Sequence, residues 1–391
     1  MIKHNRLIAG AASLAAAAAL IAGTVTTASA KPNDPPAKTT VQPYDIVGVG
    51  SDTTTNVMDA LTRGYDATIK KDSPAKPKVY SYDALPPGIT VAPPGVTYKI
   101  TPKKGCATIP RPNGSSAGIT ALNATQVIKS NGGSYSCLNF ARSSRARKTT
   151  DPKLAKGGIA FVAFARDAIT WAVRSTAKGG NNAPKSLNLK QLIGIFTCKT
   201  TNWDQVGGKN APIKVYLPQT GSGTLSTWET FMGLTTVPSC INQGPEENEG
   251  TYAGKTPTDP TNGFNSPNAI FIYSIGAYVA QKYHSAACGK TPTKTQNAFG
   301  CDVTGFLQLQ NINGVSPFST GKVPTINLKF PSGFWRTIYN VVNYSTATSD
   351  HIPPQVNALF GPKGYMCTSP VAKTEIRDYG FINYPLCGSV S

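Results

Sequence analysis

Residues 215–234 of the chain read VYLPQTGSGTLSTWETFMGL. The segment begins as a short apolar strand. Its second half predicts a helix with Leu225, Trp228, Phe231 and Met232 on one side, because these positions recur at the helical period. The turn between strand and helix is made of small and hydroxyl residues: Thr220, Gly221, Ser222, Gly223 and Thr224.

This turn has the chemistry of an anion-binding site. Glycines let the backbone approach a ligand closely, and Ser222 or Thr224 can cap the helix or point a hydroxyl outward. The first N–H groups of a helix lack internal partners and carry the positive end of the helix dipole. An ordinary capped turn would have the same sequence, so the run alone does not decide between the two.

The same order of strand, small-residue turn and helix occurs twice more. After a predicted strand at 44–49, a helix runs to about Tyr65, and a shorter helix lies within 113–127. The two turns contain Gly50, Ser51, Asp52, Thr53 and Thr54, and Gly114, Ser115 and Ser116. If the fold brings the three turns together, their hydroxyls and N–H groups would surround a tetrahedral oxyanion without a metal. Three independent helix caps are the alternative.

A basic segment, LNFARSSRAR at 138–147, places serines beside arginines. Residues 139–141 fit a strand end, and Arg142, Ser143, Ser144 and Arg145 fit the turn after it. Arg142 or Arg145 could be the charge partner of a bound anion, since a guanidinium fork matches the geometry of an oxyanion. An exposed basic loop is the simpler interpretation.

Residues 1–30 have the pattern of a secretory signal. Lys3 and Arg6 precede an apolar run at 7–25, and Ala-Ser-Ala at 28–30 fits a cleavage site. A signal anchor is the alternative. We expect an exported chain that starts near Lys31, followed by a tail at 31–43. No cysteine follows the apolar run, so nothing indicates a lipid anchor, and the mature chain has no other apolar run long enough to span a membrane.

The chain carries 38 Lys and Arg against 19 Asp and Glu, and the signal contains two of the basic residues, so the mature chain has 36 against 19, a net charge of +17. Such an excess favours anionic partners or an anionic cell surface. No block of like charges and no basic helix with interleaved aromatic residues occurs, so we interpret the charge as a solvated surface and exclude nucleic acid as a partner.

All eight cysteines lie beyond the signal, and an even number in an exported chain argues for disulfides. Many connectivities are possible. We expect neighbours to pair, because each such bond closes a local loop: Cys106 with Cys137, Cys198 with Cys240, Cys288 with Cys301, and Cys367 with Cys387. A metal site is not expected, because no Cys-x-x-Cys occurs and the only histidines are His4, His284 and His351.

The remaining pattern predicts an α/β protein with two lobes, because roughly 360 residues exceed one small core and strands alternate with helices. We expect a buried parallel strand at 158–173, an amphipathic helix at 187–196, a tryptophan-containing loop at 198–208, and a strand with a helix start at 269–279. Residues 325–330 are strand-like, and 334–344 fit a helix. The acidic turn of Glu246, Glu247 and Glu249 could cap a helix or line a cleft, but we expect it to be exposed.

Together these segments resemble the phosphate-binding solute receptors of ABC importers, which have the two-lobed periplasmic-binding-protein fold. The most specific segment is IFTCKTTNWDQVGG at 195–208, followed downstream by the TGSGT run and Phe231. The resemblance covers roughly 44–280 and also rests on these segments: VGSDTT at 49–54, GSSAGI at 114–119, FARSS at 140–144, LNLKQLIG at 187–194, and 269–278.

The resemblance implies a type 2 fold with two crossings between lobes. Lobe 1 would comprise 44–165 and 268–391, and lobe 2 would comprise 166–267. The ligand would lie in the cleft, bound by helix N-termini and hydroxyls. Carried over by position, Asp52 and Thr53 match the first contact turn, Ser116 matches the second, and the third comprises Ser222, Gly223 and Thr224.

Two positions depart from the family pattern. Pro218 stands where the family has an arginine, and Ser144 stands where it has an aspartate that accepts the ligand's proton. Arg142 or Arg145 could restore the charge. An acceptor would require Asp52 or one of the three glutamates of the acidic turn to point inward. Sulfate has no proton to donate, so such an acceptor would select phosphate against it. The resemblance therefore supports an oxyanion more strongly than phosphate itself.

The function that we expect is an extracytoplasmic solute-binding protein for inorganic phosphate or a related oxyanion, monomeric, without cofactor or catalysis, which docks on an ABC permease. The rival is a secreted or cell-surface relative that binds a different anionic or sugar-like ligand without transport, which the missing Arg and Asp favour. A secreted phosphatase is disfavoured, because the chain has no GxSxG elbow and no carboxylate–histidine cluster.

Overall fold

The computed structural model describes residues 34–36, 38–87, 89, 96–130, 133–247, 249–253, 263–284, 296–297, 300–302, 304–321 and 324–391. The predicted signal peptide lies outside these residues. So does Cys288, and with it the predicted Cys288–Cys301 disulfide. In the described part of the chain, no helix is long and apolar enough to cross a membrane.

One large sheet organises the fold. Within the described residues ten strands join it, and eight of them form a continuous path. In spatial order these are β11 (Asn242–Gln243), β10 (Lys214–Leu217), β12 (Ala269–Ser274), β8 (Ile159–Arg174), β17 (Trp335–Asn343), β7 (Phe140–Ser143), β1 (Ile46–Gly50) and β2 (Val79–Ser81). Two further strands, β15 (Leu307–Leu309) and β18 (Ile382–Asn383), also pair with β8. Mixed strands and helices confirm the predicted α/β class.

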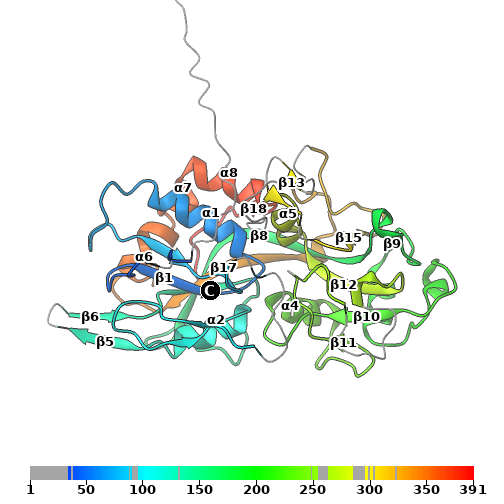
Figure 1. Ribbon diagram of the computed structural model, residues 1–391, viewed down its shortest axis with the longest axis horizontal. Helices are drawn as coiled ribbons and strands as arrows, with labels where there is room; N and C mark the ends of the chain where they lie inside the picture. Colours follow the sequence, from blue (N-terminus) through cyan, green and yellow to red (C-terminus); the bar gives the residue numbers. More distant parts are fainter. Residues whose placement is uncertain are drawn as a thin grey trace, which may run out of the picture.

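The long strands β8 and β17 run side by side through the middle of the molecule (Figure 1). The buried strand predicted at 158–173 is confirmed as β8, but the expectation that it is parallel is wrong, because β17, β12, β15 and β18 all pair with it antiparallel. A strand buried on both faces has a continuous apolar sequence whichever way its neighbours run. The sequence pattern therefore indicated burial and not direction.

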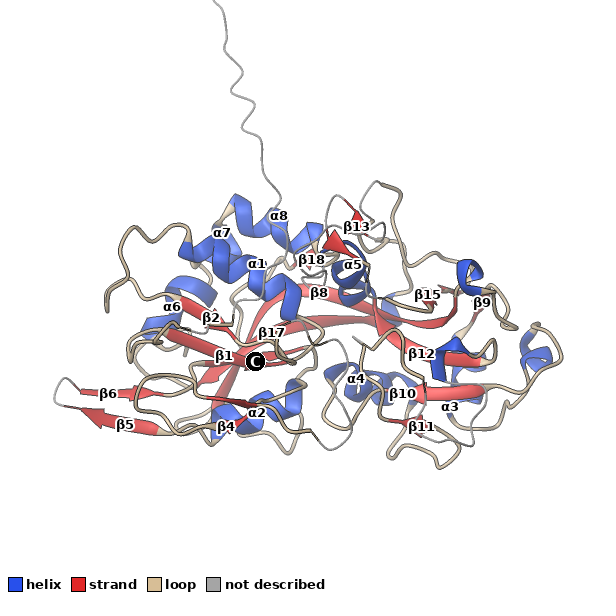
Figure 2. Ribbon diagram, viewed as in Figure 1, coloured by secondary structure: helices blue, strands red, loops and turns tan. Residues whose placement is uncertain are grey.

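Two halves flank this pair of long strands (Figure 2). In what we call the first half, β1 pairs parallel with both β2 and β7. In the second half, β10 pairs parallel with both β11 and β12. Helices pack on both. The first half contains α1 (Thr55–Asp66), α2 (Ser115–Asn123), α6 (Pro354–Phe360), α7 (Tyr365–Thr368) and α8 (Pro370–Asp378); the second contains α3 (Leu189–Phe196) and α4 (Gly223–Met232); α5 (Ile275–His284) lies between.

Each half has its own apolar core. Buried apolar side chains from 41–165 and 338–381, together with Ala280, form two clusters in the first half. The other clustered side chains, from 168–334, form a single cluster in the second half. The cluster of the second half includes Leu307, Phe330 and Phe334, and Phe334 packs against Trp228. The chain therefore passes through the second half again after residue 267, and β17 carries it back. The lobe boundaries given above remain a prediction.

Several local predictions are confirmed. The helix at 187–196 is α3, and Asn188 caps it by accepting a hydrogen bond from the Gln191 amide. The strand and helix start at 269–279 are β12 and α5. The loop at 198–208 contains a short 3-10 helix, Trp203–Val206, whose tryptophan is fully buried.

Two predictions near the C-terminal part are wrong. The helix expected at 334–344 is the strand β17, whose residues alternate between partly exposed and buried over its first half. Its aromatic and β-branched residues fit a pleated surface better than a helix. The strand-like run at 325–330 makes only an isolated bridge, between Ile326 and Phe318.

Val127, expected in the helix after the second turn, lies in a strand beyond the end of α2.

Among the described residues, four small two-stranded sheets lie outside the main one. They are β3 (Lys99–Ile100) with β4 (Ile109–Pro110), β5 (Val127–Ser130) with β6 (Gly133–Ser136), β9 (Ser186–Leu187) with β16 (Asn311–Ile312), and β13 (Gln296–Asn297) with β14 (Gly300–Cys301).

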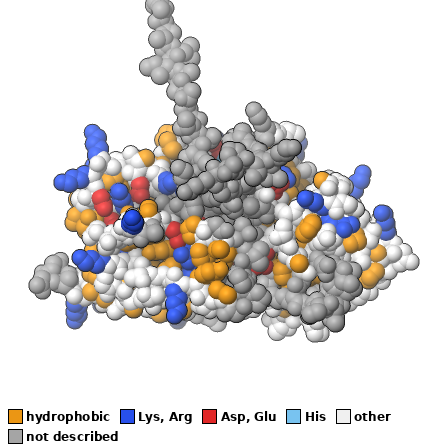
Figure 3. Space-filling model, in the orientation of Figure 1, with side chains coloured by type: hydrophobic (Ala, Val, Ile, Leu, Met, Phe, Trp, Pro, Cys, Tyr) orange, Lys and Arg blue, Asp and Glu red, His pale blue; other side chains and the backbone are white. Residues whose placement is uncertain are grey.

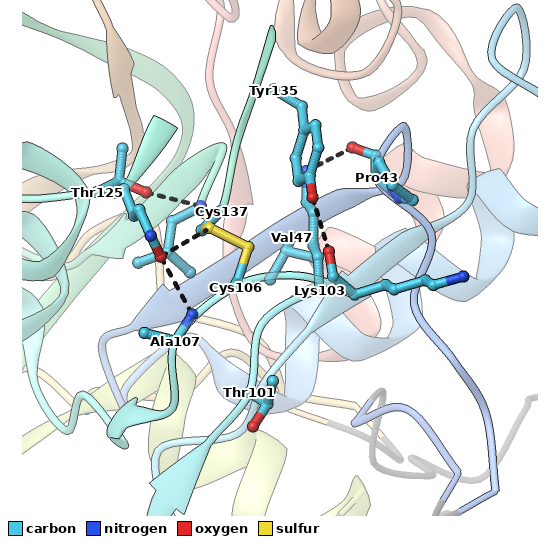
Figure 4. The surroundings of a disulfide bond; sticks show 12 residues. Pro43, Val47, Thr101, Lys103, Cys106, Ala107, Thr125, Tyr135 and Cys137 are labelled. Carbon is cyan, nitrogen blue, oxygen red and sulfur yellow. Dashed lines mark hydrogen bonds between the residues drawn. A yellow bond between two sulfur atoms is a disulfide. The ribbon is translucent and has the colours of Figure 1, made fainter. Parts of the chain in front are cut away.

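Three of the predicted disulfides are confirmed, with Cα–Cα separations of 5.9, 6.4 and 5.4 Å: Cys106–Cys137, Cys198–Cys240 and Cys367–Cys387. The first ties the β5–β6 hairpin to the segment after β3 (Figure 4). Beside it, the Tyr135 hydroxyl donates a hydrogen bond to Lys104 O at 2.8 Å. The hairpin is thus fixed to the first half at two points.

The basic side chains visible on one face of the molecule lie apart from one another. Figure 3 shows Lys and Arg at separate places on the visible face, without a single continuous patch. This distribution fits the interpretation of the charge as a solvated surface.

Candidate functional site

The three small-residue turns meet where the two halves face each other. The Ser116 amide at the start of α2 donates to Gly221 O at 3.1 Å, which joins the second turn to the third. A Cβ placed on Gly223 would overlap the Oγ atoms of Ser115 and Ser144, so the approach of α4 to the first half requires glycine there. The predicted convergence of the helix starts is therefore a feature of the fold.

The alternative of three independent caps fits one turn only. Ser222 caps α4, since its Oγ accepts a hydrogen bond from the Leu225 amide at 3.3 Å. Neither α1 nor α2 has a side-chain cap bond from its N-cap residue, Thr54 or Gly114. The hydroxyls of the first two turns are thus available for other contacts.

Five buried hydroxyls form a connected group, which we call the hydroxyl cluster: Ser51, Thr53, Ser115, Ser144 and Thr224. Ser51 Oγ donates to Ser144 Oγ at 3.1 Å, and Ser144 Oγ donates to Thr53 Oγ1 at 3.2 Å. Ser115 Oγ lies 3.3 Å from Ser144 Oγ, and Thr53 Oγ1 lies 3.3 Å from Thr224 Oγ1. The last contact crosses from the first half to the second.

The hydrogen bonds of this cluster run in one direction. Thr53 Oγ1 donates its single proton to Glu247 Oε2 at 2.8 Å, so it must accept from both Thr224 and Ser144. By the same reasoning Ser115 donates to Ser144. Every proton of the cluster therefore points along a path that ends at the Glu247 carboxylate.

Glu247 lies inside the site. It is 1% exposed, and its Oε1 accepts a hydrogen bond from the Ser274 amide at 2.7 Å. Burial, together with the negative charge of Asp52, raises the pKa of Glu247 to about 7 despite the nearby Arg336. The expectation of an exposed acidic turn is wrong, because Glu246 and Glu249 are also buried.

The reason lies in the first half, which presents donors to this turn. Asn113 Nδ2 donates to Glu246 Oε1 at 2.8 Å, just as Thr53 donates to Glu247. The partners stand 133 and 194 residues away in the sequence, so the pattern around the turn could not reveal them.

Sequence reasoning missed a cation, Arg336 on β17. It is 7% exposed, and its Nη2 lies 2.8 Å from Asp167 Oδ2 and 3.0 Å from Thr224 Oγ1. Its Nη1 is buried and has no hydrogen-bond partner among the described residues. The available signal was a lone arginine in the apolar alternation WRTIYNVVN, which the interpretation of that segment as a helix concealed.

Asp52 is a buried acceptor without a donor. It is 6% exposed, and neither carboxylate oxygen makes a hydrogen bond to the described residues. Burial raises the pKa of Asp52, and the nearby amides of Thr53 and Asp52 and the charges of Arg336 and Arg142 only partly oppose this. A ligand hydroxyl would find an acceptor here.

Arg142 supports the first turn from within the fold. Its Nε donates to Ser51 O, its Nη1 to Ser81 Oγ and Tyr82 O, and its Nη2 to Gly50 O and Thr55 Oγ1. A guanidinium has five N–H donors, so none remains for the anion contact predicted for this residue.

Arg145 and the other predicted residues lie around the cluster. Arg145 pairs with Asp151 at 2.6 Å and donates from Nε to Ser116 Oγ at 3.1 Å. Ser143 Oγ donates to Arg145 O, away from the cluster. Thr220 is exposed and accepts a hydrogen bond from Gln243. In the described part of the chain, no group of three His, Cys, Asp or Glu side chains could hold a metal ion.

Comparison with known proteins identifies the family. A profile described as a PBP superfamily domain matches residues 34–319. Similar solved structures include an ABC-type phosphate transport receptor from Vibrio cholerae, with 18% identity and a TM-score of 0.47 over 87% of this chain and 100% of that one. Another is a putative phosphate ABC transporter substrate-binding protein from Clostridium perfringens, with 19% identity and a TM-score of 0.48 over 87% and 99%.

A phosphate-binding protein from Stenotrophomonas maltophilia is also similar, with 14% identity and a TM-score of 0.44 over 88% of this chain and 91% of that one. Among curated proteins no match was found. The profile covers most of the chain, including all three turns and the acidic turn. The chain belongs to the PBP superfamily and has the predicted periplasmic-binding-protein fold.

Proposed function

We propose that this protein captures inorganic phosphate or a related oxyanion between its two halves and delivers it to an ABC importer. The observation that carries the proposal is the hydroxyl cluster, which joins the starts of three helices to a buried arginine. Helix N-termini, hydroxyls and a guanidinium are the donors that bind oxyanions in proteins without a metal. The ligand contacts would come from Thr53, Ser144, Thr224 and the amides at the start of α4.

Arg336 supplies the cation in this proposal. The family pattern places an arginine where this chain has Pro218, and both Arg142 and Arg145 have their donors engaged within the protein. Arg336 is bonded to Thr224, and its unpartnered Nη1 would donate a charge-assisted hydrogen bond to the ligand.

Asp52 supplies the proton acceptor. Ser144 stands where the family has its aspartate, and the unpaired carboxylate of Asp52 lies next to Thr53 in the first turn. A protonated phosphate oxygen would donate to it, whereas sulfate would place an unprotonated oxygen against a carboxylate. We therefore expect phosphate to bind more tightly than sulfate.

The two halves would act as two lobes that close on the ligand. Contacts that already cross between them support this: Ser116 N with Gly221 O, Thr53 with Thr224, and Asn113 with Glu246. The bounds proposed for the lobes are 44–165 with 268–391, and 166–267, apart from the stretch up to residue 334 whose buried side chains pack in the core of the second half. The protein would act as an exported monomer and present the closed face to a permease.

The test is calorimetric titration of residues 31–391, freed of bound anion by partial unfolding and refolding. We expect one-to-one binding of phosphate, weaker binding of sulfate, and loss of phosphate binding in a Ser144→Ala/Thr224→Val variant. Thr230→Ala, an exposed hydroxyl on the same helix, serves as the control and should bind like the wild type. Binding of neither anion by the folded wild-type protein would refute the proposal.

A second candidate is a sugar-like ligand bound without a transport role. Two buried carboxylates, Asp52 and Glu247, favour it, because carboxylates accept hydrogen bonds from ligand hydroxyls. Adding monosaccharides and sugar phosphates to the same titration separates this candidate from inorganic phosphate.

A further inference from the structure

The carboxylate of Glu247 makes the contacts that a bound oxyanion would make. Its Oε2 accepts the Thr53 hydroxyl at 2.8 Å, and its Oε1 accepts the Ser274 amide at 2.7 Å. The chain of hydroxyl donors in the cluster ends at this carboxylate. The hydrogen bonds of the cluster therefore point toward an anion that belongs to the protein itself. Glu247 is 1% exposed, so these bonds are not shared with bulk solvent.

We infer that Glu247 determines the specificity of the site by competing with the ligand: an oxyanion binds by displacing this carboxylate from Thr53 and Ser274. The inference rests on the function proposed above. It assigns to Glu247 the role of an internal competitor, distinct from the proton acceptor assigned to Asp52.

The charges around Glu247 favour displacement over joint binding. Arg336 is already paired with Asp167, and the ion pairs found among the described residues do not include Glu247. The nearby charge of Asp52 repels it. An oxyanion that entered beside Asp52 and Glu247 would add to the negative charge that already faces Arg336, whereas an oxyanion that replaced Glu247 would inherit its two donors.

Because the Glu247 carboxylate competes for the same donors, a ligand binds only if it gains more binding free energy than the carboxylate loses. A group held on the same chain acts at an effective concentration in the millimolar range or above. A ligand with one carboxylate offers the same two acceptors as Glu247 and gains little by replacing it. A tetrahedral oxyanion brings additional oxygens, which can accept from Arg336 Nη1 and from the Thr224 and Ser144 hydroxyls. The site should therefore take phosphate-like anions and reject monocarboxylates.

The experiment titrates phosphate and acetate into the wild type and three variants. Glu247→Gln removes the charge at nearly constant shape, and Glu247→Asp keeps the charge on a side chain that is one methylene too short to reach Thr53. Glu229→Gln, on α4 and outside the hydroxyl cluster, is the control for a change in net charge. Thermal unfolding is measured first, to establish that each variant is folded.

We expect both Glu247 variants to bind phosphate at least tenfold more tightly than the wild type, and Glu229→Gln to match the wild type. Acetate should bind measurably only to the Glu247 variants. If the wild type binds phosphate and the Glu247 variants bind it equally or more weakly, Glu247 is a ligand contact and the inference fails alone. If Glu247→Gln binds phosphate more tightly than the wild type but Glu247→Asp does not, the removed charge explains the effect. The inference that the carboxylate occupies the donors of Thr53 and Ser274 in place of the ligand then fails. Binding by none of the folded proteins would overturn the proposed function together with the inference.

Discussion

Replacing Arg336 with methionine would remove the guanidinium that joins β17 to the hydroxyl cluster. Its Nη2 lies 2.8 Å from Asp167 Oδ2, and both side chains are almost fully buried. Removing one partner of a buried ion pair costs about 3–5 kcal/mol, because the other charge is left without compensation. Asp167 keeps hydrogen bonds from Ser274 Oγ and the Gly276 amide, so we expect a loss near 3 kcal/mol in the free energy of unfolding.

The same substitution tests the role of Arg336 as the ligand's cation. A hydrogen bond to a charged group contributes about 1.5–3 kcal/mol, which corresponds to a loss of roughly 10- to 150-fold in phosphate affinity. Stability is measured by urea unfolding followed through tryptophan fluorescence, and affinity by calorimetric titration of the folded variant.

The double variant Arg336→Met/Asp167→Asn separates the two effects. It removes both charges, so the buried site is left without an uncompensated ion, and we expect unfolding free energy within about 1 kcal/mol of the wild type. Phosphate affinity should stay low. Recovery of both stability and affinity would show that Arg336 is only structural. Unchanged stability in the single variant would contradict the ion-pair reasoning.

Three further predictions follow from the site and its surroundings. Because the pKa of Glu247 is raised to about 7, its contribution to stability is fully present below about pH 4.5 and is lost as the pH rises to about 7. Asp66 and Asp83, whose pKa values are also raised to about 7, lose stability over the same range in every variant, so in urea unfolding between pH 4.5 and 8 the loss in the wild type should exceed that in Glu247→Gln by about 3 kcal/mol, and equal losses would contradict this. Replacing both Cys367 and Cys387 with serine opens a loop of 20 residues and should lower the unfolding free energy by about 3 kcal/mol under non-reducing conditions, and an unchanged urea midpoint would contradict this. Gly223→Ala should weaken phosphate binding by about tenfold or more, since the added Cβ overlaps two cluster hydroxyls, whereas Gly333→Ala, where a Cβ meets nothing within 4 Å, should bind normally; equal titrations of the two would refute the steric argument.

Local chemistry explains what could be predicted from the sequence. The turns before α1, α2 and α4 could be predicted because glycines and hydroxyl residues lie within a few residues of an apolar strand and an apolar helix face. That the three turns meet follows from the way the two halves face each other, and the only indication of this in the sequence was the resemblance, which implies a cleft lined by helix N-termini. The direction of β8 could not be predicted, because burial on both faces gives the same apolar run with either kind of neighbour.

Asp52 was among the predicted site residues, but the burial of the two other charged members, Arg336 and Glu247, could not be predicted, for a different reason. Arg336 contacts Thr224 across 112 residues, and Glu247 contacts Thr53 across 194. Nothing near either residue in the sequence shows that it will be buried, since an isolated arginine or an acidic turn is usually exposed. For Arg142 the error is the opposite one, because the sequence predicted an anion contact that its hydrogen bonds leave no room for. The sequence does not reveal that five backbone and hydroxyl acceptors take all the N–H donors of this side chain.

The pairing of β8 with β17 also has a mechanical consequence. The two strands share nine residue pairs, from Trp335 with Ala168 to Asn343 with Ile159, so sliding one half past the other would break the whole ladder, whereas flexing the ribbon breaks none of it. The ladder is interrupted once, between Ile338 and Tyr339, where an extra residue on the opposite strand loosens the pleat. That interruption is the natural point of flexure, and it lies two residues from Arg336. Any rocking of one half against the other would therefore move the guanidinium, so that, if Arg336 binds the anion as we propose, the stiffness of the ribbon would also set the affinity for it.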